Sequence, residues 1–411
     1  MSVFILHAPA TLNGTVLLPP SKSLSARALV IHWLARGDTK LKNLSDCDDT
    51  FVMQSALEHP AETTDIMAAG TAMRFLTAAF AVSNRQTLLT GTKRMQHRPI
   101  HTLVDALRSL GAQIDYMYKI GFPPLQVTGK TLEGGDVTLD GNVSSQFTSA
   151  LLMIGPTMKR GLRLRLNGTI ISRPYIDMTL QLMRTFGAQA DWTSDHELEV
   201  KPVHYVAKPY TIENDWSAAS YWYESVALSA DNNAKVTLPG LNKTSLQGDA
   251  KVQELFKPLG VVTKFEKGCP ILYKSNITTR HYEANLEEQP DLAQTLVITC
   301  AMLGISFRIT GLQSLRIKET DRLAALKTEL HKLGKEIIIE GDDTLLWNGH
   351  TDAGETHPII DTYEDHRMAL AFAPCAFILP ELGINHPQVV SKSYPHFWDS
   401  LQQMGFIIES K

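Results

Sequence analysis

The stretch "LVDALRSLGAQI", residues 103–114, decides the fold, because it has four similar copies further along the chain. Each copy places apolar residues at helical spacing, then a glycine, then a short run of strand-like residues. Glycine suits the left-handed position just after a helix. The glycines recur every 71 to 76 residues, for example from Gly111 to Gly187 (76) and from Gly334 to Gly405 (71). The other copies are "LQLMRTFGAQA" (180–190), "VQELFKPLGVVT" (252–263), "LKTELHKLGKEI" (326–337) and "FWDSLQQMGFII" (397–408).

A second series of helices alternates with the first and recurs every 71 to 75 residues. These segments are rich in small and apolar residues, and each precedes a short strand-like segment. Because they are apolar nearly all round, we expect them to be buried, with the amphipathic series covering them. After the first member, their predicted starts are Thr71, Gln146, Ser217, Asp291 and His366.

The two series together predict six copies of one α/β unit, which suggests two domains of three units each. The break between them should fall near "TIENDWSAAS", residues 211–220. The first copy is short, since only 46 residues separate Ser25 from Thr71. "SALEHPAETTD", residues 55–65, stands where a helix, glycine and strand are expected. We therefore expect an outer helix–strand portion to be missing there.

The composition is that of an ordinary globular protein, with 411 residues, 44% hydrophobic, 20% charged and a formal net charge of −4. This balance gives no general attraction to nucleic acid or to anionic membranes. No apolar run reaches the roughly 20 residues of a membrane span. The start, "MSVFILHAPA", does not resemble a signal peptide. The four cysteines have no CxxC spacing. We expect a reduced, soluble, cytoplasmic protein.

Polar or charged residues stand at the start of every predicted buried helix. Ser, Thr, Asp and Asn cap helices for stability alone, and this is the simplest interpretation of any one of them. Capping does not explain Lys22, Arg27, His366 and Arg367, because cations oppose the dipole at a helix N-terminus. These positions predict binding of a ligand with more than one phosphate or carboxylate.

Eight short motifs are spread over all six units, from about Pro19 to Pro395. They are "LPPSKSLSARALV" (18–30), "AAGTAMRFL" (68–76), "HRPIHTLVDALRSLGA" (97–112), "SSQFTSALL" (144–152), "SRPYIDMT" (172–179), "TSLQGD" (244–249), "RIKETDRLAAL" (316–326) and "DHRMALAFA" (365–373). Together these motifs resemble those of the 5-enolpyruvylshikimate-3-phosphate (EPSP) synthase family.

This resemblance implies an α/β (α+β) fold of two similar domains, each with three βαβαββ repeats around buried helices. One domain would span residues 20–214 and the other residues 1–19 plus 215–411, linked at a hinge by two chain crossings. The implied reaction transfers enolpyruvyl from phosphoenolpyruvate to the 5-hydroxyl of shikimate 3-phosphate and releases phosphate. The family uses no metal or organic cofactor, and we expect a monomer with these two small-molecule substrates.

The resemblance also assigns catalytic roles. Asp291 would be the base on the 5-hydroxyl, Glu319 would carry the proton to the methylene carbon, and Lys22 would contact both substrates. His366 would act on the phosphate side. Simpler interpretations exist: Asp291 as a helix cap, Glu319 in a surface ion pair worth under about 1 kcal/mol, and His366 as an ordinary helix-start histidine.

The substrate-binding residues follow from the same motifs. For shikimate 3-phosphate they are Lys22, Ser23, Arg27, Ser144, Ser145, Gln146, Ser172, Tyr175, Asp291, Ser314 and Lys318. For phosphoenolpyruvate they are Lys22, Gly70, Arg98, Gln146, Arg322, Arg367 and Lys392. Arginine's planar fork suits carboxylate and phosphate. For Lys392 a surface role is an equal alternative.

Three residues depart from the family pattern. Ala68 replaces a common Asn, Phe75 replaces a common Pro, and Ser314 replaces the Asn of some members. These changes bear on affinity, and on the response to the herbicide glyphosate, more than on the reaction.

Two alternative functions use the same scaffold. A UDP-N-acetylglucosamine enolpyruvyl transferase would lack the "SSQ" and "KETDR" motifs and carry a reactive cysteine, which "GTKRMQHRPIH" (91–101) does not contain. A non-catalytic phosphosugar-binding relative would not need Lys22, Asp291 and Glu319. His97 and His101 have metal-ligand spacing, but Pro99 lies between them and no third ligand is near in sequence, so we predict no metal site.

Overall fold

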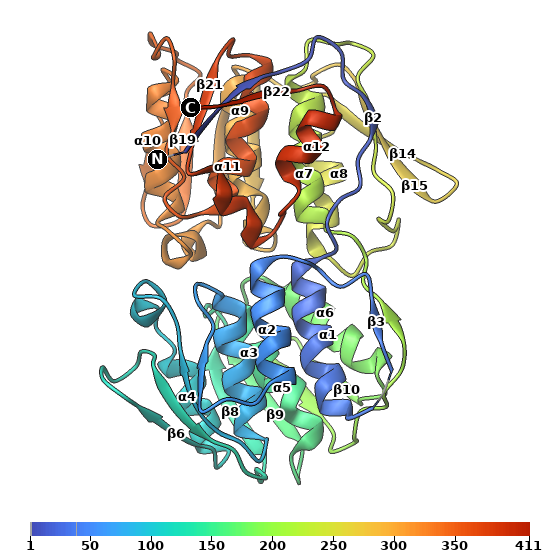
Figure 1. Ribbon diagram of the computed structural model, residues 1–411, viewed down its shortest axis with the longest axis vertical. Coiled ribbons are helices and arrows are strands. Elements are labelled where there is room, and N and C mark those ends of the chain that lie inside the picture. Colours follow the sequence, from blue (N-terminus) through green and yellow to red (C-terminus); the bar gives the residue numbers. More distant parts are fainter. Residues whose placement is uncertain (1, 38) are drawn as a thin grey trace. The chain divides into compact units, whose positions relative to one another are not determined.

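The computed structural model describes residues 2–37 and 39–411 and divides the chain into two compact units (Figure 1). The insert unit is Pro20–Ile212, and the terminal unit joins the segment ending at Pro19 to Glu213–Lys411. The sequence motifs predict the second boundary after residue 214. Glu213 and Asn214 belong to the terminal unit because their side chains bond there, Glu213 Oε1 to Trp216 Nε1 (3.0 Å) and Asn214 Nδ2 to the Pro239 carbonyl (3.0 Å).

Two copies of the predicted repeat are complete in the insert unit. In each, a strand, an inner helix and a parallel strand are followed by an outer helix and two antiparallel strands. The first copy is β4 (Thr63–Asp65), α3 (Gly70–Ala81), β5 (Gln86–Thr90), α4 (His101–Ser109), β6 (Gln113–Tyr116) and β7 (Leu125–Thr128). The second is β8 (Gly135–Asp140), α5 (Ser145–Ile154), β9 (Leu162–Asn167), α6 (Arg173–Thr185), β10 (Ala190–Ser194) and β11 (Glu197–Val200). Their sheet orders are β4-β5-β7-β6 and β10-β11-β9-β8.

The remaining copy of the insert unit is the short one, which comes first along the chain. The structure corrects the prediction of what this copy lacks. It consists of β12 (Tyr210–Thr211), α1 (Lys22–Ala35), β3 (Leu41–Lys42) and α2 (Asp48–Glu58). Among the described residues, β12 and β3 form a parallel sheet of two strands only. The outer helix, α2, is therefore present, and the antiparallel pair of strands is what this copy lacks. Residues 55–58 end α2, and residues 63–65 already form β4 of the next sheet.

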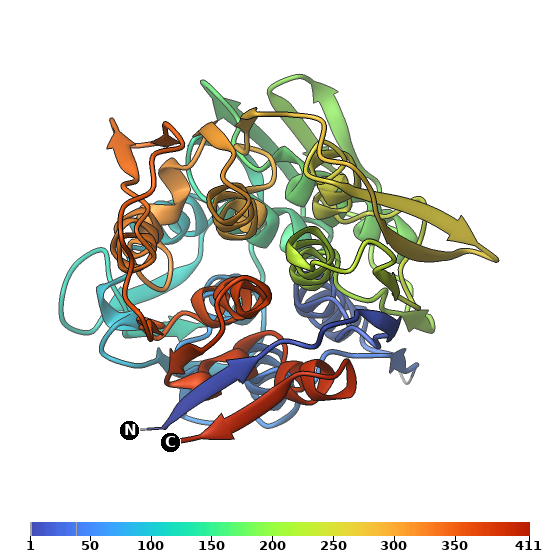
Figure 2. The same cartoon turned by 90° about the horizontal axis from the view of Figure 1, so that it is seen from above.

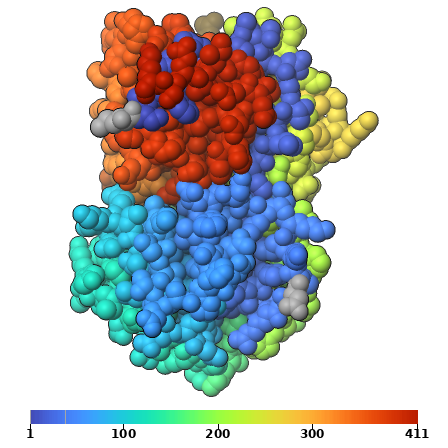
Figure 3. Space-filling view, in the orientation of Figure 1, coloured from blue at the N-terminus to red at the C-terminus, as the bar shows by residue number. Residues whose placement is uncertain are grey.

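The terminal unit contains three complete copies, two of which use strands from the start of the chain. Figure 3 shows this N-terminal segment in blue on the surface of the unit. The first copy is β2 (Asn13–Thr15), α7 (Trp216–Leu228), β13 (Lys235–Thr237), α8 (Val252–Leu255), β14 (Val261–Glu266) and β15 (Cys269–Lys274). The second is β16 (His281–Asn285), α9 (Ala293–Met302), β17 (Ser306–Thr310), α10 (Arg322–Lys332), β18 (Ile338–Glu340) and β19 (Thr344–Trp347). The third is β20 (Ile359–Ile360), α11 (His366–Phe372), β21 (Leu382–Asn385), α12 (Phe397–Gln403), β22 (Ile407–Ser410) and β1 (Val3–His7).

The sheet orders of the terminal unit are β14-β15-β13-β2, β16-β17-β19-β18 and β20-β21-β1-β22. In each sheet the first two strands of the repeat are parallel and the remaining pairs are antiparallel. The βαβαββ repeat and the α/β fold class are thus confirmed.

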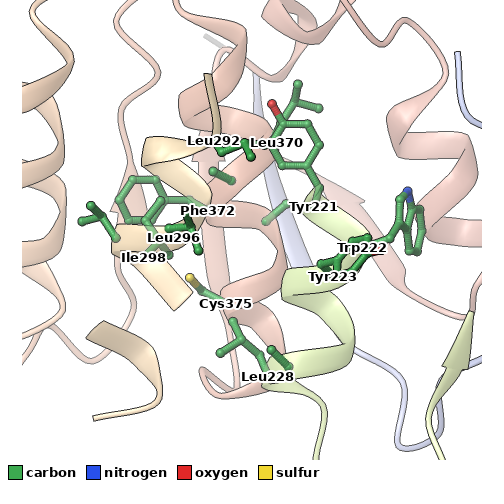
Figure 4. Close-up of a cluster of buried hydrophobic side chains, with 14 of the residues drawn as sticks. Tyr221, Trp222, Tyr223, Leu228, Leu292, Leu296, Ile298, Leu370, Phe372 and Cys375 are labelled. Carbon is green, nitrogen blue, oxygen red and sulfur yellow. The ribbon is translucent and has the colours of Figure 1, made fainter. Parts of the chain in front are cut away.

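The apolar helices are the inner ones, as predicted. In the terminal unit α7, α9 and α11 run side by side, seen end-on in Figure 2. Every residue of α7 except Ser217 is buried. Side chains of the three helices, including Tyr221, Leu296 and Phe372, meet in one hydrophobic core (Figure 4). Burial of this apolar surface stabilises the unit at roughly 25 cal/mol per Å².

The glycines of the outer series adopt the predicted left-handed conformation. Their φ angles are 100° at Gly111, 89° at Gly187, 89° at Gly260, 73° at Gly334 and 95° at Gly405. Each follows an outer helix and precedes an edge strand. A residue with a Cβ would be strained at this position, so the spacing of these glycines marks the repeat in the sequence.

Candidate active site

Asp291 in the terminal unit lies among three cationic side chains. Its Oδ2 is 2.7 Å from Arg367 Nη2, and its Oδ1 is 3.5 Å from Arg322 Nη1 and 3.9 Å from Lys318 Nζ. The cations come from α11, from α10 and from the turn before α10. Residues far apart in sequence therefore converge on one carboxylate.

Asp291 does not occupy the N-cap position of the buried helix, where its simpler interpretation placed it. It lies in the 3-10 turn Pro290–Leu292, and the N-cap position of α9 is Leu292, which makes no side-chain cap bond. The Asp291 side chain is 19% exposed. It therefore keeps some access for a proton donor while being held by Arg367 and Arg322.

Glu319 bridges two further cations. Its Oε2 is 3.0 Å from Arg322 Nη2, and its Oε1 is 3.2 Å from Lys392 Nζ. The Glu319 side chain is 13% exposed, so this is no surface ion pair. Lys392, in the 3-10 helix Pro387–Lys392, is also buried, and the surface interpretation of that lysine is wrong.

Asp365 fixes Arg322, and we had not identified it as part of the site. Its carboxylate is 2.7 Å from Arg322 Nε and 3.2 Å from Nη2, and it caps α11 by accepting from the Arg367 backbone N–H (2.9 Å). Burial alone would lower the pKa of Arg322, but Asp365 and Glu319 raise that pKa above its usual value. Arg322 therefore stays charged in an enclosed site.

The charged run "RIKETDR" divides into structural and site residues. Asp321 caps α10 by accepting from the backbone N–H groups of Leu323 (3.1 Å) and Ala324 (3.2 Å). It also pairs with Arg316 Nη1 at 3.2 Å. Arg316 and Asp321 thus hold the turn, while Lys318 and Arg322 face Asp291 and Glu319 pairs with Arg322. Ser314 lies in the preceding 3-10 helix, Gln313–Ile317.

His366 begins α11 beside Arg367 and is 1% exposed. Its Nδ1 lies 3.6 Å from Asp365 Oδ1. A fourth carboxyl group, that of Asp249, also acts on this cluster and is not among the site residues predicted from the sequence. Asp249 is buried and accepts a hydrogen bond from Ser217 Oγ. Burial, and then the charge of Asp291, raise the pKa of Asp249 to about 7.

In the insert unit, Lys22 and Ser23 begin the inner helix α1. Lys22 Nζ is 3.7 Å from Asp49 Oδ2 of α2, the outer helix of the same short repeat. Asp49 is buried, so it neutralises part of the positive charge of Lys22. This contact depends on α2, the outer helix whose absence the sequence predicts.

Arg27 is almost fully buried and bonded inside the insert unit. Its Nε donates to Thr179 Oγ1 (2.7 Å), its Nη1 to the Ser23 carbonyl (3.0 Å), and its Nη2 to Ser149 Oγ (3.3 Å) and the Tyr175 carbonyl (3.4 Å). Burial lowers the pKa of Arg27 to about 10. Bonds to other described residues engage four of the five guanidinium hydrogens, so one on Nη1 can serve a ligand.

The "SSQ" motif forms the start of α5. Ser144 is the N-cap and accepts from the Gln146 backbone N–H at 3.4 Å, while Gln146 Nε2 donates to Thr71 Oγ1 at 3.1 Å. Ser172 stands at the N-cap of α6 with φ 55°, and Tyr175 follows in the first turn. Both helix starts carry partial positive charge, which suits a phosphate.

Gly70 and Arg98 lie against each other, although 28 positions separate them in the chain. Gly70 begins α3, and Arg98 ends the 3-10 helix Met95–His97. The buried Nε of Arg98 has no hydrogen-bond partner among the described residues. Two of the four predicted phosphoenolpyruvate contacts of this unit, Gly70 and Arg98, are thus adjacent.

The histidine pair near Arg98 is not joined by further ligands. His97 Nδ1 is 2.6 Å from the Lys93 carbonyl, and His101 lies beside Gly121. Among residues 2–37 and 39–411, no group of three or more His, Cys, Asp or Glu side chains could hold a metal ion. In the same described segments, every helix is too short or too polar to cross a bilayer.

Comparison with known proteins agrees with these motifs. The family model described as "EPSP synthase (3-phosphoshikimate 1-carboxyvinyltransferase)" matches residues 6–64 and 54–401. A 3-phosphoshikimate 1-carboxyvinyltransferase of Bacteroides fragilis is 53% identical over 406 residues, covering 99% of this chain and 98% of the relative. One of Tolumonas auensis is 36% identical over 427 residues, covering 97% and 98%.

The fold has similar solved structures as well. The EPSP synthase of Acinetobacter baumannii superposes with a TM-score of 0.78 over the whole of both chains, at 20% identity. This likeness supports the fold independently of the sequence motifs.

Proposed function

The chain belongs to the EPSP synthase family, the 3-phosphoshikimate 1-carboxyvinyltransferases, and we propose which of its residues carry out the family's reaction. The protein is a transferase that moves the enolpyruvyl group of phosphoenolpyruvate to shikimate 3-phosphate, a step of the shikimate pathway toward aromatic amino acids. Transfer to a UDP-amino sugar is not favoured.

The reaction adds a hydroxyl across the enol double bond and then eliminates phosphate from the tetrahedral intermediate. It needs a base at the 5-hydroxyl and an acid at the methylene carbon. Asp291 acts as the base in this proposal, because it is partly accessible and its neighbours Arg367 and Arg322 favour its ionised form. Glu319 carries the proton to the methylene carbon, Lys22 contacts both substrates, and His366 acts beside the leaving phosphate.

Phosphoenolpyruvate is held by Arg322, Arg367 and Lys392 of the terminal unit and by Arg98 of the insert unit. The first three are buried and each already touches a carboxylate. A phosphate or carboxylate of the substrate can replace part of these contacts, and such charge-assisted bonds are the strong ones. Gly70, Lys22 and Gln146 complete this set.

Shikimate 3-phosphate is bound by the N-terminal ends of α5 and α6 and by side chains that surround the ring of the substrate. Ser144, Ser145, Gln146 and Ser172 supply neutral donors for the phosphate, where a helix N-terminus favours an anion. Ring and carboxylate contacts come from Ser23, the remaining N–H of Arg27, Tyr175, Ser314 and Lys318. Neither substrate set needs a metal or an organic cofactor.

The observation that carries this proposal is the convergence of Lys318, Arg322 and Arg367 on Asp291. The test is release of inorganic phosphate from phosphoenolpyruvate, which should require shikimate 3-phosphate and should not occur with UDP-N-acetylglucosamine. Ser145→Ala serves as a site probe, and calorimetry should show weakened binding of shikimate 3-phosphate to a folded protein. An unchanged affinity for shikimate 3-phosphate would mean that Ser145 does not contribute to binding this substrate.

A further inference from the structure

Tyr221 touches the cation cluster from inside the hydrophobic core. It lies in the second turn of α7 and is 2% exposed. Its hydroxyl oxygen accepts a hydrogen bond from Arg367 Nη1 at 3.1 Å. Its ring packs edge-on against Phe397, with centroids 6.1 Å apart. In Figure 4 the hydroxyl points away from the end of the cluster that contains Cys375 and Leu228.

Arg367 is held at both terminal nitrogens by different elements. Nη1 bonds to Tyr221 of α7, and Nη2 lies 2.7 Å from Asp291 in the turn before α9. The two partners differ in charge. Asp291 neutralises the guanidinium and competes with any anionic ligand for it, whereas a phenol orients the guanidinium and leaves its positive charge intact.

The phenol stays neutral in this setting. Burial raises the pKa of Tyr221 to about 12, although Arg367 acts in the opposite direction. Asp291 and Arg322 are the other charged groups that act on it. Tyr221 is thus a neutral acceptor at any pH at which the enzyme would be assayed.

We propose that Tyr221 is a positioning residue that fixes the guanidinium of Arg367 for an anionic group of phosphoenolpyruvate. The inference rests on the proposed function, which assigns Arg367 to that substrate. The hydrogen bond sets the direction of one terminal nitrogen, and this direction remains when the ligand displaces Asp291. Bidentate recognition of a carboxylate or phosphate depends on that orientation.

The test compares Tyr221→Phe with Tyr223→Phe. Tyr223 is a matched control, because it lies on the same helix, is fully buried, and bonds through its hydroxyl to Thr263 Oγ1 at 2.6 Å, outside the cation cluster. Each change keeps the ring and removes one buried hydrogen bond. Phosphate release is measured while each substrate is varied in turn, and thermal unfolding of each variant is recorded.

Tyr221→Phe should raise the KM for phosphoenolpyruvate about tenfold, since a hydrogen bond to a charged group is lost. The KM for shikimate 3-phosphate should change less than about twofold. Tyr223→Phe should leave both KM values unchanged while lowering the unfolding temperature to a similar extent.

One outcome is that the wild-type enzyme releases phosphate while Tyr221→Phe shows an unchanged KM for phosphoenolpyruvate. That result would overturn the inference and leave the proposed function intact. Equal rises for both substrates, or the same rise in Tyr223→Phe, would also overturn it, because they would indicate a structural role. A wild-type protein that releases no phosphate would instead overturn the proposed function, and the inference with it.

Discussion

A Cβ atom on Gly70 would lie 2.5 Å from Nη1 of Arg98. No side chain fits at that distance, so any substitution of Gly70 must move the end of Arg98. The arginine side chain is flexible, and α3 can begin with alanine, so the fold should tolerate the change.

Gly70→Ala should therefore raise the KM for phosphoenolpyruvate about tenfold or more, because Arg98 is displaced from the position in which it meets the ligand. The KM for shikimate 3-phosphate should change much less. Steady-state kinetics with each substrate varied in turn will measure both. Equal shifts, or no shift in either, would mean that the contact between Gly70 and Arg98 does not serve phosphoenolpyruvate.

Asp291→Asn should separate catalysis from binding. Loss of a general base should lower kcat by about 10²–10⁴-fold. Phosphoenolpyruvate should bind no more weakly, since Arg367 and Arg322 lose a competing carboxylate. Rapid-quench measurement of turnover, together with calorimetry in the presence of shikimate 3-phosphate, checks both statements.

Asp321→Asn is the matched control for that experiment. Asp321 is a carboxylate on the same charged run, but it caps α10 and pairs with Arg316 instead of facing Asp291. Asparagine is as good an N-cap as aspartate, so stability should change little. If Asp321→Asn lowered kcat as strongly as Asp291→Asn, the role of Asp291 as base would lose its support.

Asp249 should make the stability of the protein depend on pH. Its pKa is about 7 in the fold, raised by burial and then by Asp291, whereas an unfolded Asp titrates near 3.9. Between these values the folded state binds a proton that the unfolded state has lost. The free energy of unfolding therefore falls as pH rises, with a contribution of about 1.4 kcal/mol per pH unit. Below about pH 4 this contribution is fully present, and it is lost above about pH 7.

Asp249→Asn removes this titration. Urea unfolding at several pH values from 4 to 8 should show a wild-type-minus-variant difference that declines with pH and levels off above about pH 7. Asp291, Arg367, Asp215 and Ser217 are among the groups that act on Asp249, and all four remain in the variant. A difference that stays constant across this range would contradict a proton on Asp249 in the folded state.

The repeat could be predicted from the sequence because it depends on local chemistry. A left-handed glycine after each outer helix, such as Gly111, and an inner helix that is apolar all round are both visible without knowledge of tertiary contacts. The outer helix of the short copy was missed because it has no such glycine. It ends instead at His59, before Pro60, and its first turn carries Asp48 and Asp49, which favour a helix start.

The charged part of the site was predictable for a related reason. Cations at the start of a buried helix, such as Arg367, oppose the helix dipole and so indicate a ligand. The partners of those cations were not predictable, because their pairing depends on how separate elements pack. Asp365 is 43 positions from Arg322, and Tyr221 is 146 positions from Arg367. No local pattern joins residues at such separations.

The outer helix of the short repeat, α2, is bound at its C-terminal end by a cation from the neighbouring repeat. Arg85 Nη1 donates to the Ala56 carbonyl at 3.0 Å and Nη2 to the Leu57 carbonyl at 2.8 Å, at the C-terminal end of α2. Its guanidinium also lies over the rings of Trp33 and Phe80, 5.3 Å and 5.5 Å from their centroids. A positive charge at a helix C-terminus is favourable, and so are cation–π contacts.

Arg85→Ala should lower the free energy of unfolding by about 2 kcal/mol, because α2 loses both carbonyl partners and the two rings lose a packing partner. Arg85→Lys keeps the charge but cannot donate to both carbonyls in the same fork, so its loss should be smaller. Chemical denaturation of the three proteins will rank them, and hydrogen exchange should show faster exchange of α2 amides in Arg85→Ala. Equal stability of all three would mean that α2 holds its place in the short repeat without Arg85.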